Sequence, residues 1–221
     1  MIKIKKFTVY RRPCGMEQKS SKILAFLMKI GDLFFLNILY ILCCIPVVTA
    51  GAATSALYHC TVKMVRKEES YLTKDFFSAF RRNFVKATIL YLAAAAVYAV
   101  LAGDFYLSRF LPSGIQPLLL AVLIILAVFF SLIAAYLIPL VDYYGKSIAD
   151  IVKTAFFLAF SHVFRSFIMV FMNALIPALL LIYPTFFLRI LPLIGFLGFS
   201  SVAYANSRIF LSAADPDALH S

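Results

Sequence analysis

The chain has 221 residues, of which 63% are hydrophobic and 14% are charged, whereas soluble domains average roughly 45–50% apolar and about 25% charged residues. This composition excludes an ordinary water-soluble globular domain. The formal net charge of +11 would suggest nucleic acid as a partner of a soluble protein. Here, however, the lysines and arginines lie in short blocks beside apolar runs, as in membrane proteins that keep basic loops in the cytoplasm. We therefore expect no nucleic-acid partner.

The first 22 residues are polar and basic, with no apolar core and no small-residue cleavage site, so they do not fit a secretory signal peptide. We expect residues 1–22 to form a basic cytoplasmic tail. A single transmembrane domain then covers residues 23–206, and residues 207–221 form a second cytoplasmic tail. The basic residues of the first tail are Lys3, Lys5, Lys6, Arg11, Arg12, Lys19 and Lys22.

The apolar run over residues 23–62 is too long for one crossing, because a bilayer-spanning helix needs roughly 20 residues. A single crossing would also place the basic tail and the basic stretch 63–86 on opposite sides of the membrane, which the retention of basic loops in the cytoplasm disfavours. The segment IPVVTAG at Ile45–Gly51 contains a proline and a glycine, which predict a tight outer turn. A short second span over residues 52–65 follows, and a re-entrant or interfacial segment is its alternative.

Four further spans complete the predicted architecture. The fold class is therefore all-α: a polytopic transmembrane helix bundle with about six spans, or five if residues 52–65 are re-entrant. The loop 103–116 faces outward and the more basic loop 142–165 faces inward, so both termini are expected to be cytoplasmic in a bacterial inner membrane. The further spans are expected at residues 84–102, 117–141, 166–184 and 187–206.

Residues 76–84 and 156–164 resemble each other at an offset of 80 positions, with five of nine aligned residues identical. Each copy carries apolar residues at intervals of four and basic or polar residues on other faces, which predicts two amphipathic helices at the cytoplasmic surface. Two parallel structural units, as in some transporters, would produce such an internal repeat. The alternative is chance similarity between two phenylalanine-rich helices.

Three stretches of the sequence resemble a known family: GDLFFLN from Gly31, IPVVTAGAATSALY from Ile45, and DFF with FRRNF between Asp75 and Phe84. They are similar to the YesL-like family of bacterial integral membrane proteins, whose function is unknown. Genes of that family often lie beside sugar-uptake ATP-binding-cassette transporters and polysaccharide-degrading enzymes, so the resemblance implies an association with carbohydrate uptake or sensing. Since family members begin shortly before the Gly-Asp motif, the resemblance also implies Met16 as a candidate native start.

Few polar side chains lie within the expected spans. Placing a charged group in the hydrocarbon core of a membrane costs ~2.5 kcal/mol or more in free energy. An interfacial ion pair is therefore the favoured role for Asp32, and also for Asp142 near the inner end of the fourth span. A side-chain amide in a span usually bonds a neighbouring helix. The candidate intramembrane polar residues are Asp32, Asn37, Thr54, Tyr58, His59 and Asn173.

The sequence contains no acid/base pair, serine–histidine arrangement, phosphate loop or HExxH motif, and its four cysteines lack metal-ligand spacing. We therefore expect neither an enzyme nor a cofactor or metal site.

The first functional hypothesis is an accessory or scaffold protein that docks a membrane transporter or sensor subunit through a basic cytoplasmic face, which also meets anionic lipid head groups. The alternative is a small transporter or channel subunit for an uncharged, sugar-related solute, with a path lined by Asn37, Thr54, Tyr58 and Asn173. The candidate docking residues are Lys74, Asp75, Arg81, Arg82, Asn83, Lys153 and Arg165.

Overall fold

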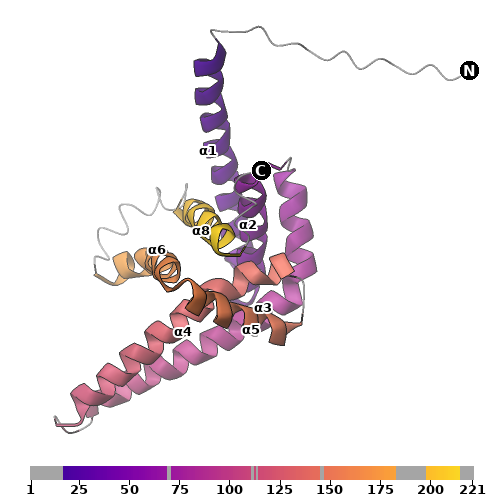
Figure 1. Ribbon diagram of the computed structural model, residues 1–221. Helices are drawn as coiled ribbons and strands as arrows, with labels where there is room; N and C mark the ends of the chain where they lie inside the picture. The colour runs from indigo at the N-terminus through magenta and orange to yellow at the C-terminus, as the bar shows by residue number, and fades with distance from the viewer. Residues whose placement is uncertain are drawn as a thin grey trace, which may run out of the picture.

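The computed structural model describes residues 17–68, 71–110, 112, 114–144, 147–182 and 198–214. All regular structure in these residues is helical (Figure 1), in agreement with the all-α prediction. The helices are α1 (Glu17–Cys44), η1 (Val47–Thr49), α2 (Ala50–Val65), α3 (Leu72–Leu107), η2 (Ser108–Phe110), α4 (Gln116–Tyr144), α5 (Ile148–Ser161), α6 (Val163–Ile182) and α8 (Phe199–Ala214).

Three segments of the described chain are long and apolar enough to cross a membrane: Leu27–Cys44, Leu72–Phe110 and Gln116–Tyr143. A fourth arises if Ile148–Ser161 and Val163–Leu175, which are bent by 107° relative to each other, are one broken span. These helices are compatible with a membrane protein. The count of six crossings remains a prediction.

The chain turns between α1 and α2, where the sequence predicts a break. Helix α1 ends at Cys44, the extended Pro46 precedes the short η1, and α2 begins at Ala50. The Oγ1 atom of Thr49 lies 2.6 Å from the carbonyl oxygen of Cys43, an acceptor in the last turn of α1. It also lies 2.7 Å from the carbonyl oxygen of Pro46, which accepts the Thr49 backbone N–H at 3.0 Å. The predicted break is confirmed.

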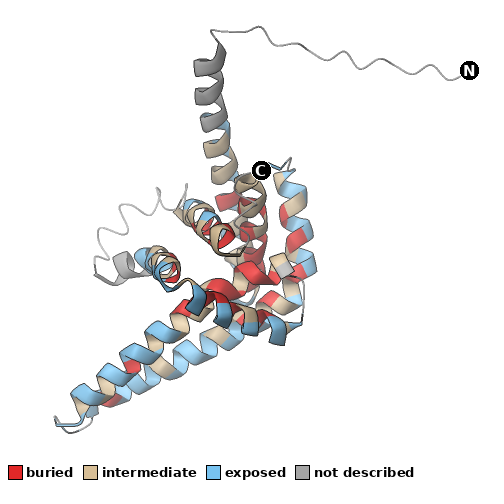
Figure 2. Ribbon diagram, in the orientation of Figure 1, coloured by how far each residue is buried: buried red, intermediate tan, exposed pale blue. Residues whose placement is uncertain are grey.

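Helix α2 lies inside the bundle, and nine of its 16 residues are buried. It packs against α1, α3, α4 and α8, and Figure 2 shows buried residues concentrated around it. A methyl group added at Gly51 would lie 2.6 Å from Cβ of Tyr91 and 2.7 Å from the carbonyl oxygen of Ala87. The small residues of this stretch therefore allow close approach to α3, as the sequence predicts. At about 24 Å, α2 is shorter than the ~30 Å hydrocarbon core, so its crossing stays a prediction.

Helix α3 is one continuous helix of 36 residues, about 54 Å long. Its first part lies beside α2 and its last part runs beside α4 (Figure 1). The segment predicted as a separate amphipathic helix before residue 84 is therefore the beginning of α3. The outer faces of the α3–α4 hairpin are exposed and apolar, for example Val100 at 63% and Ile125 at 67% exposure, as expected for lipid-facing surfaces.

Helix α5 packs along α4 and is followed by a sharp bend. The ring of Phe129 in α4 lies 6.3 Å from that of Phe156 and 5.1 Å from that of Phe160. At the bend, Oγ of the fully buried Ser166 lies 3.1 Å from the Ala159 carbonyl oxygen and 3.2 Å from the hydroxyl of Tyr136. The hydroxyl of Ser166 therefore forms hydrogen bonds within the bend.

The two copies of the sequence repeat have different surroundings. Phe76 is completely buried, whereas the aligned Phe156 is 50% exposed. In addition, α3 continues past the first copy, but α5 ends at Ser161 and α6 starts after the bend. The repeat is visible in the sequence, and two equivalent structural units remain a prediction.

The last described helix, α8, overlaps the C-terminal part of the predicted final span 187–206 and continues beyond it. The first part of that span, residues 187–197, lies outside the described residues, which resume at 198. Helix α8 continues to Ala214, and Ser207, Phe210 and Leu211 are buried in it. Residues 207–214, predicted as tail, are therefore helical because their apolar side chains pack into the bundle.

Candidate functional site

Side-chain contacts bring together helix ends that carry many of the basic residues of the described chain. The C-terminal ends of α2, α4 and α8 meet the N-terminal ends of α3 and α6, as expected when consecutive helices run in opposite directions. Arg109, in η2, lies instead at the far end of the α3–α4 hairpin. The contacts are Lys63 Nζ to Asp75 Oδ2 at 3.1 Å, Arg66 Nη2 to the Tyr143 hydroxyl at 2.9 Å, and Arg165 Nη1 to the Ser212 carbonyl oxygen at 2.6 Å.

The carboxylate of Asp142 is the centre of a polar cluster that joins α2, α3 and α4. Nδ1 of His59 lies 2.6 Å from Asp142 Oδ2, and Arg82 forms an ion pair with Oδ1. Asn83 Nδ2 also donates to Oδ1, at 2.8 Å, and lies 3.0 Å from the Ser55 hydroxyl. The side chains of Asp142 and His59 are only 14% and 16% exposed, so this carboxylate is held almost entirely by protein groups.

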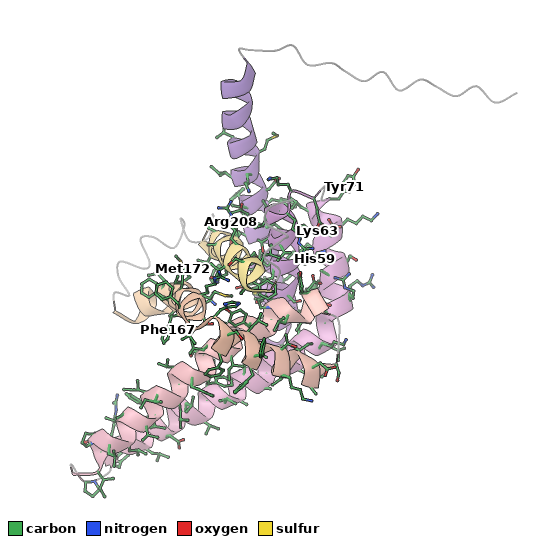
Figure 3. The ribbon with its side chains drawn as sticks, viewed as in Figure 1. His59, Lys63, Tyr71, Phe167, Met172 and Arg208 are labelled. Atoms are coloured by element: carbon green, nitrogen blue, oxygen red, sulfur yellow. The ribbon has the colours of Figure 1, made fainter. Side chains whose placement is uncertain are left out.

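The cluster includes one of the candidate intramembrane residues, His59, which is a partner of Asp142. Asp142 forms an ion pair with Arg82, and the location of this pair at the membrane interface stays a prediction. Figure 3 shows His59 and Lys63 one turn apart on α2. The sequence does not reveal this pairing, because His59 and Asp142 are separated by 83 positions. Asp32 lies elsewhere, at a polar cavity of about 250 Å³ that is also lined by Lys29 and Lys67.

The candidate docking residues divide into a group whose side chains bond within the fold and a group whose side chains do not. In the first group Asn83 is buried, whereas the side chain of Arg82 is 56% exposed. The members of the first group are Asp75, Arg82, Asn83 and Arg165. Lys74, Arg81 and Lys153 are exposed, and we find no side-chain partner for them within the described chain.

A small polar cavity of about 110 Å³ lies where α1, α2, α6 and α8 meet. Thr54, Tyr58 and Asn173, three of the four residues expected to line a solute path, line this cavity together. The fourth, Asn37, is completely buried, and its Oδ1 accepts a hydrogen bond from the backbone N–H of Ser200 at 3.1 Å. The remaining lining residues are Tyr40, Leu57, Phe199, Val202 and Ala203.

Asn206 holds two of the lining side chains in place. It is fully buried, and its Nδ2 donates to the Tyr58 hydroxyl at 3.2 Å and to Asn173 Oδ1 at 2.8 Å. The sequence analysis missed this residue because it placed Asn206 at the end of a span. A polar pair, Asn206 and Ser207, within an apolar helical stretch is the signal that could have indicated it.

A second cavity, of about 390 Å³, lies between α3, α4 and α6. Asn173 lines both this cavity and the first one. In the second cavity, the hydroxyls of Tyr98 and Ser131 are 2.9 Å apart. Both cavities that Asn173 lines therefore also contain neutral hydroxyl groups.

Among the described residues, no group of three or more His, Cys, Asp or Glu side chains could hold a metal ion. Cys60 is buried, whereas Cys43 and Cys44 are partly exposed, and these three cysteines are free thiols.

A family model described as "Protein of unknown function, DUF624" matches residues 33–105, about a third of the chain. The match covers the C-terminal part of α1, all of α2 and most of α3, and so includes His59, Arg82, Thr54 and Tyr58. Asp142 and Asn173 lie outside it. No curated protein and no solved structure is found to be similar to the chain. The match thus relates the α1–α3 part of the bundle to a protein family of unknown function.

Proposed function

We propose that the chain is a multi-pass protein of a bacterial inner membrane, with six crossings and both termini in the cytoplasm. The three long apolar helices and α6, which follows the bend, supply four crossings, and α2 and α8 supply two short ones, while α5 with Lys153 lies at the cytoplasmic surface. The gathering of basic residues at one end of the bundle supports a cytoplasmic location for that end. An impermeant thiol reagent tests the orientation. In a background without native cysteines, it should label Gly114→Cys in intact cells and Lys153→Cys only after permeabilisation, and the reverse pattern would refute it.

Within this topology, we propose an accessory or scaffold role, not catalysis. The observation that carries it is a stripe along the exposed face of α3, where Lys74, Phe77, Ser78, Arg81 and Val85 recur at intervals of three or four residues and so share one face. Phe77 is 43% and Val85 is 66% exposed. A mixed basic and apolar stripe suits an acidic segment of another membrane protein. The resemblance to the YesL-like family supports a transporter or sensor subunit of carbohydrate uptake as that partner.

Cross-linking in native membranes, followed by affinity purification and mass spectrometry, tests this role. The informative variant is Lys74→Glu/Arg81→Glu, because both side chains are exposed. Arg82 is left unchanged, since its reversal would repel Asp142 and disturb the fold. The matched control is Arg109→Glu, a charge reversal at the other end of the hairpin.

We expect one membrane protein to be recovered with the wild type and the control and to be lost with the double variant. Recovery of no protein with the wild type would refute the docking role. Recovery of anionic lipid alone would assign the stripe to head groups instead.

A second candidate function is movement of a small uncharged solute. It is favoured by one observation: three residues of the predicted path line a single cavity, and Asn173 connects this cavity to a second one. Solute flux into liposomes that contain the purified protein tests it. Flux equal to that of empty liposomes for every neutral solute would refute it.

A further inference from the structure

The described residues that line the cavity at Tyr58 are all neutral. Their hydrogen-bonding side chains are the hydroxyls of Tyr40, Thr54 and Tyr58 and the amide of Asn173, and no lysine, arginine, histidine, aspartate or glutamate of the described chain lines it. A buried ionic ligand would require an opposite charge. Hydroxyl and amide groups each both donate and accept hydrogen bonds. The lining therefore suits a neutral ligand that also carries both donors and acceptors.

Three of these groups are held in place by their neighbours. The hydroxyl of Thr54 donates its hydrogen to the carbonyl oxygen of Ala50 at 2.8 Å and lies 3.4 Å from the hydroxyl of Tyr40, so its oxygen can accept one further hydrogen bond. Asn206 donates to both Tyr58 and Asn173 and thereby fixes their positions at the cavity wall. Such preorganised polar groups orient a ligand in an otherwise apolar site.

The remaining wall is apolar and partly aromatic. The rings of Tyr40 and Phe199 are 5.3 Å apart and tilted at 46°, and Leu57, Val202 and Ala203 complete the lining. This wall can contact C–H groups, while the hydroxyls and the amide contact polar groups. A molecule that presents both along a short carbon chain matches this arrangement.

The volume limits the size of such a ligand. Sites for drug-sized ligands typically measure about 300–1,000 Å³, whereas this cavity measures about 110 Å³. The cavity is therefore smaller than a typical site for a drug-sized ligand, which favours a small solute.

We propose that this cavity binds a short polyol of the size of glycerol. The inference rests on the second candidate function, solute movement, and names the class of solute. The hydroxyls of the polyol would bond to Thr54, Tyr58 and Asn173, and its C–H groups would pack on Tyr40 and Phe199.

Saturation-transfer NMR on the full chain in lipid nanodiscs, purified without glycerol, tests the proposal with glycerol, urea and sorbitol as separate probes. The variants Thr54→Val and Tyr58→Phe each remove one hydroxyl at nearly constant shape. The matched control is Tyr136→Phe, which removes a tyrosine hydroxyl that is buried outside the cavity and bonded to Ser166.

We expect saturation transfer to glycerol with the wild type. Each cavity variant should weaken the affinity for glycerol roughly three- to tenfold, as for the loss of one hydrogen bond. The control variant should leave the affinity unchanged. No transfer to glycerol, transfer to urea alone, equal transfer to sorbitol, or an equal loss in Tyr136→Phe would each overturn the proposal.

A parallel liposome swelling assay separates this proposal from solute movement. Glycerol binding without glycerol flux would retain the binding site and refute movement of this solute. Flux of another neutral solute without glycerol binding would retain solute movement and refute the polyol site.

Discussion

Replacing Gly51 by alanine should separate α2 from α3. The added methyl group would lie 2.6 Å from Cβ of Tyr91 and 2.7 Å from the carbonyl oxygen of Ala87. Neither atom is at the end of a flexible side chain, so rotamer changes cannot relieve the contact. The two helices must move apart by about 0.8 Å to reach ordinary van der Waals distance.

The expected cost follows from two opposing terms. Overpacking a well-packed site typically costs about 1–3 kcal/mol. Replacing glycine by alanine in a helix returns roughly 0.5–1 kcal/mol, so we expect a net loss of up to about 2.5 kcal/mol in the free energy of unfolding. For a chain of this size, that loss lowers the melting temperature by up to about 10 °C.

The buried thiol of Cys60 provides the assay. This side chain is completely buried on α2, so a fluorogenic maleimide reacts with it only when the packing around α2 opens. The melting temperature in mild detergent is measured with Cys60 as the sole cysteine. The matched control is Gly103→Ala on α3, where nothing lies within 4 Å of the added methyl group. A melting temperature of Gly51→Ala equal to or above that of Gly103→Ala would show that the two helices are not in close contact at Gly51.

Two further substitutions test other contacts of the fold. Asp142→Asn leaves Arg82 without its counter-charge and should lower stability by about 1–3 kcal/mol; a loss no larger than that of the exposed Asp104→Asn in the same thermal assay would contradict the role of the cluster. Ser166→Ala removes the hydroxyl at the α5–α6 bend and should cost about 1–2 kcal/mol. Its control is Ser147→Ala, at a helix start where the side chain makes no capping bond, and equal effects of the two would argue against the bend contact.

Local sequence patterns were sufficient to predict the helices and one break. The length of each apolar run limits where a bilayer-spanning helix can lie, and proline within Ile45–Gly51 interrupts helical hydrogen bonding wherever the rest of the chain goes. The small residues after Gly51 also indicate close packing without naming the partner helix. These features depend on properties of neighbouring residues, so the sequence alone determined them.

Other features depend on which faces of distant helices meet. Arg81 and Arg82 are adjacent and equally basic, yet Arg81 faces outward and Arg82 pairs with Asp142, because successive residues on a helix point about 100° apart. Only the packing of α3 on α2 and α4 decides between them. Likewise, Asn206 reaches Tyr58 across 148 positions of sequence, and no periodicity in either helix predicts that contact. The tertiary structure alone therefore decided which polar residues form the charged cluster, which line the cavity and which remain exposed.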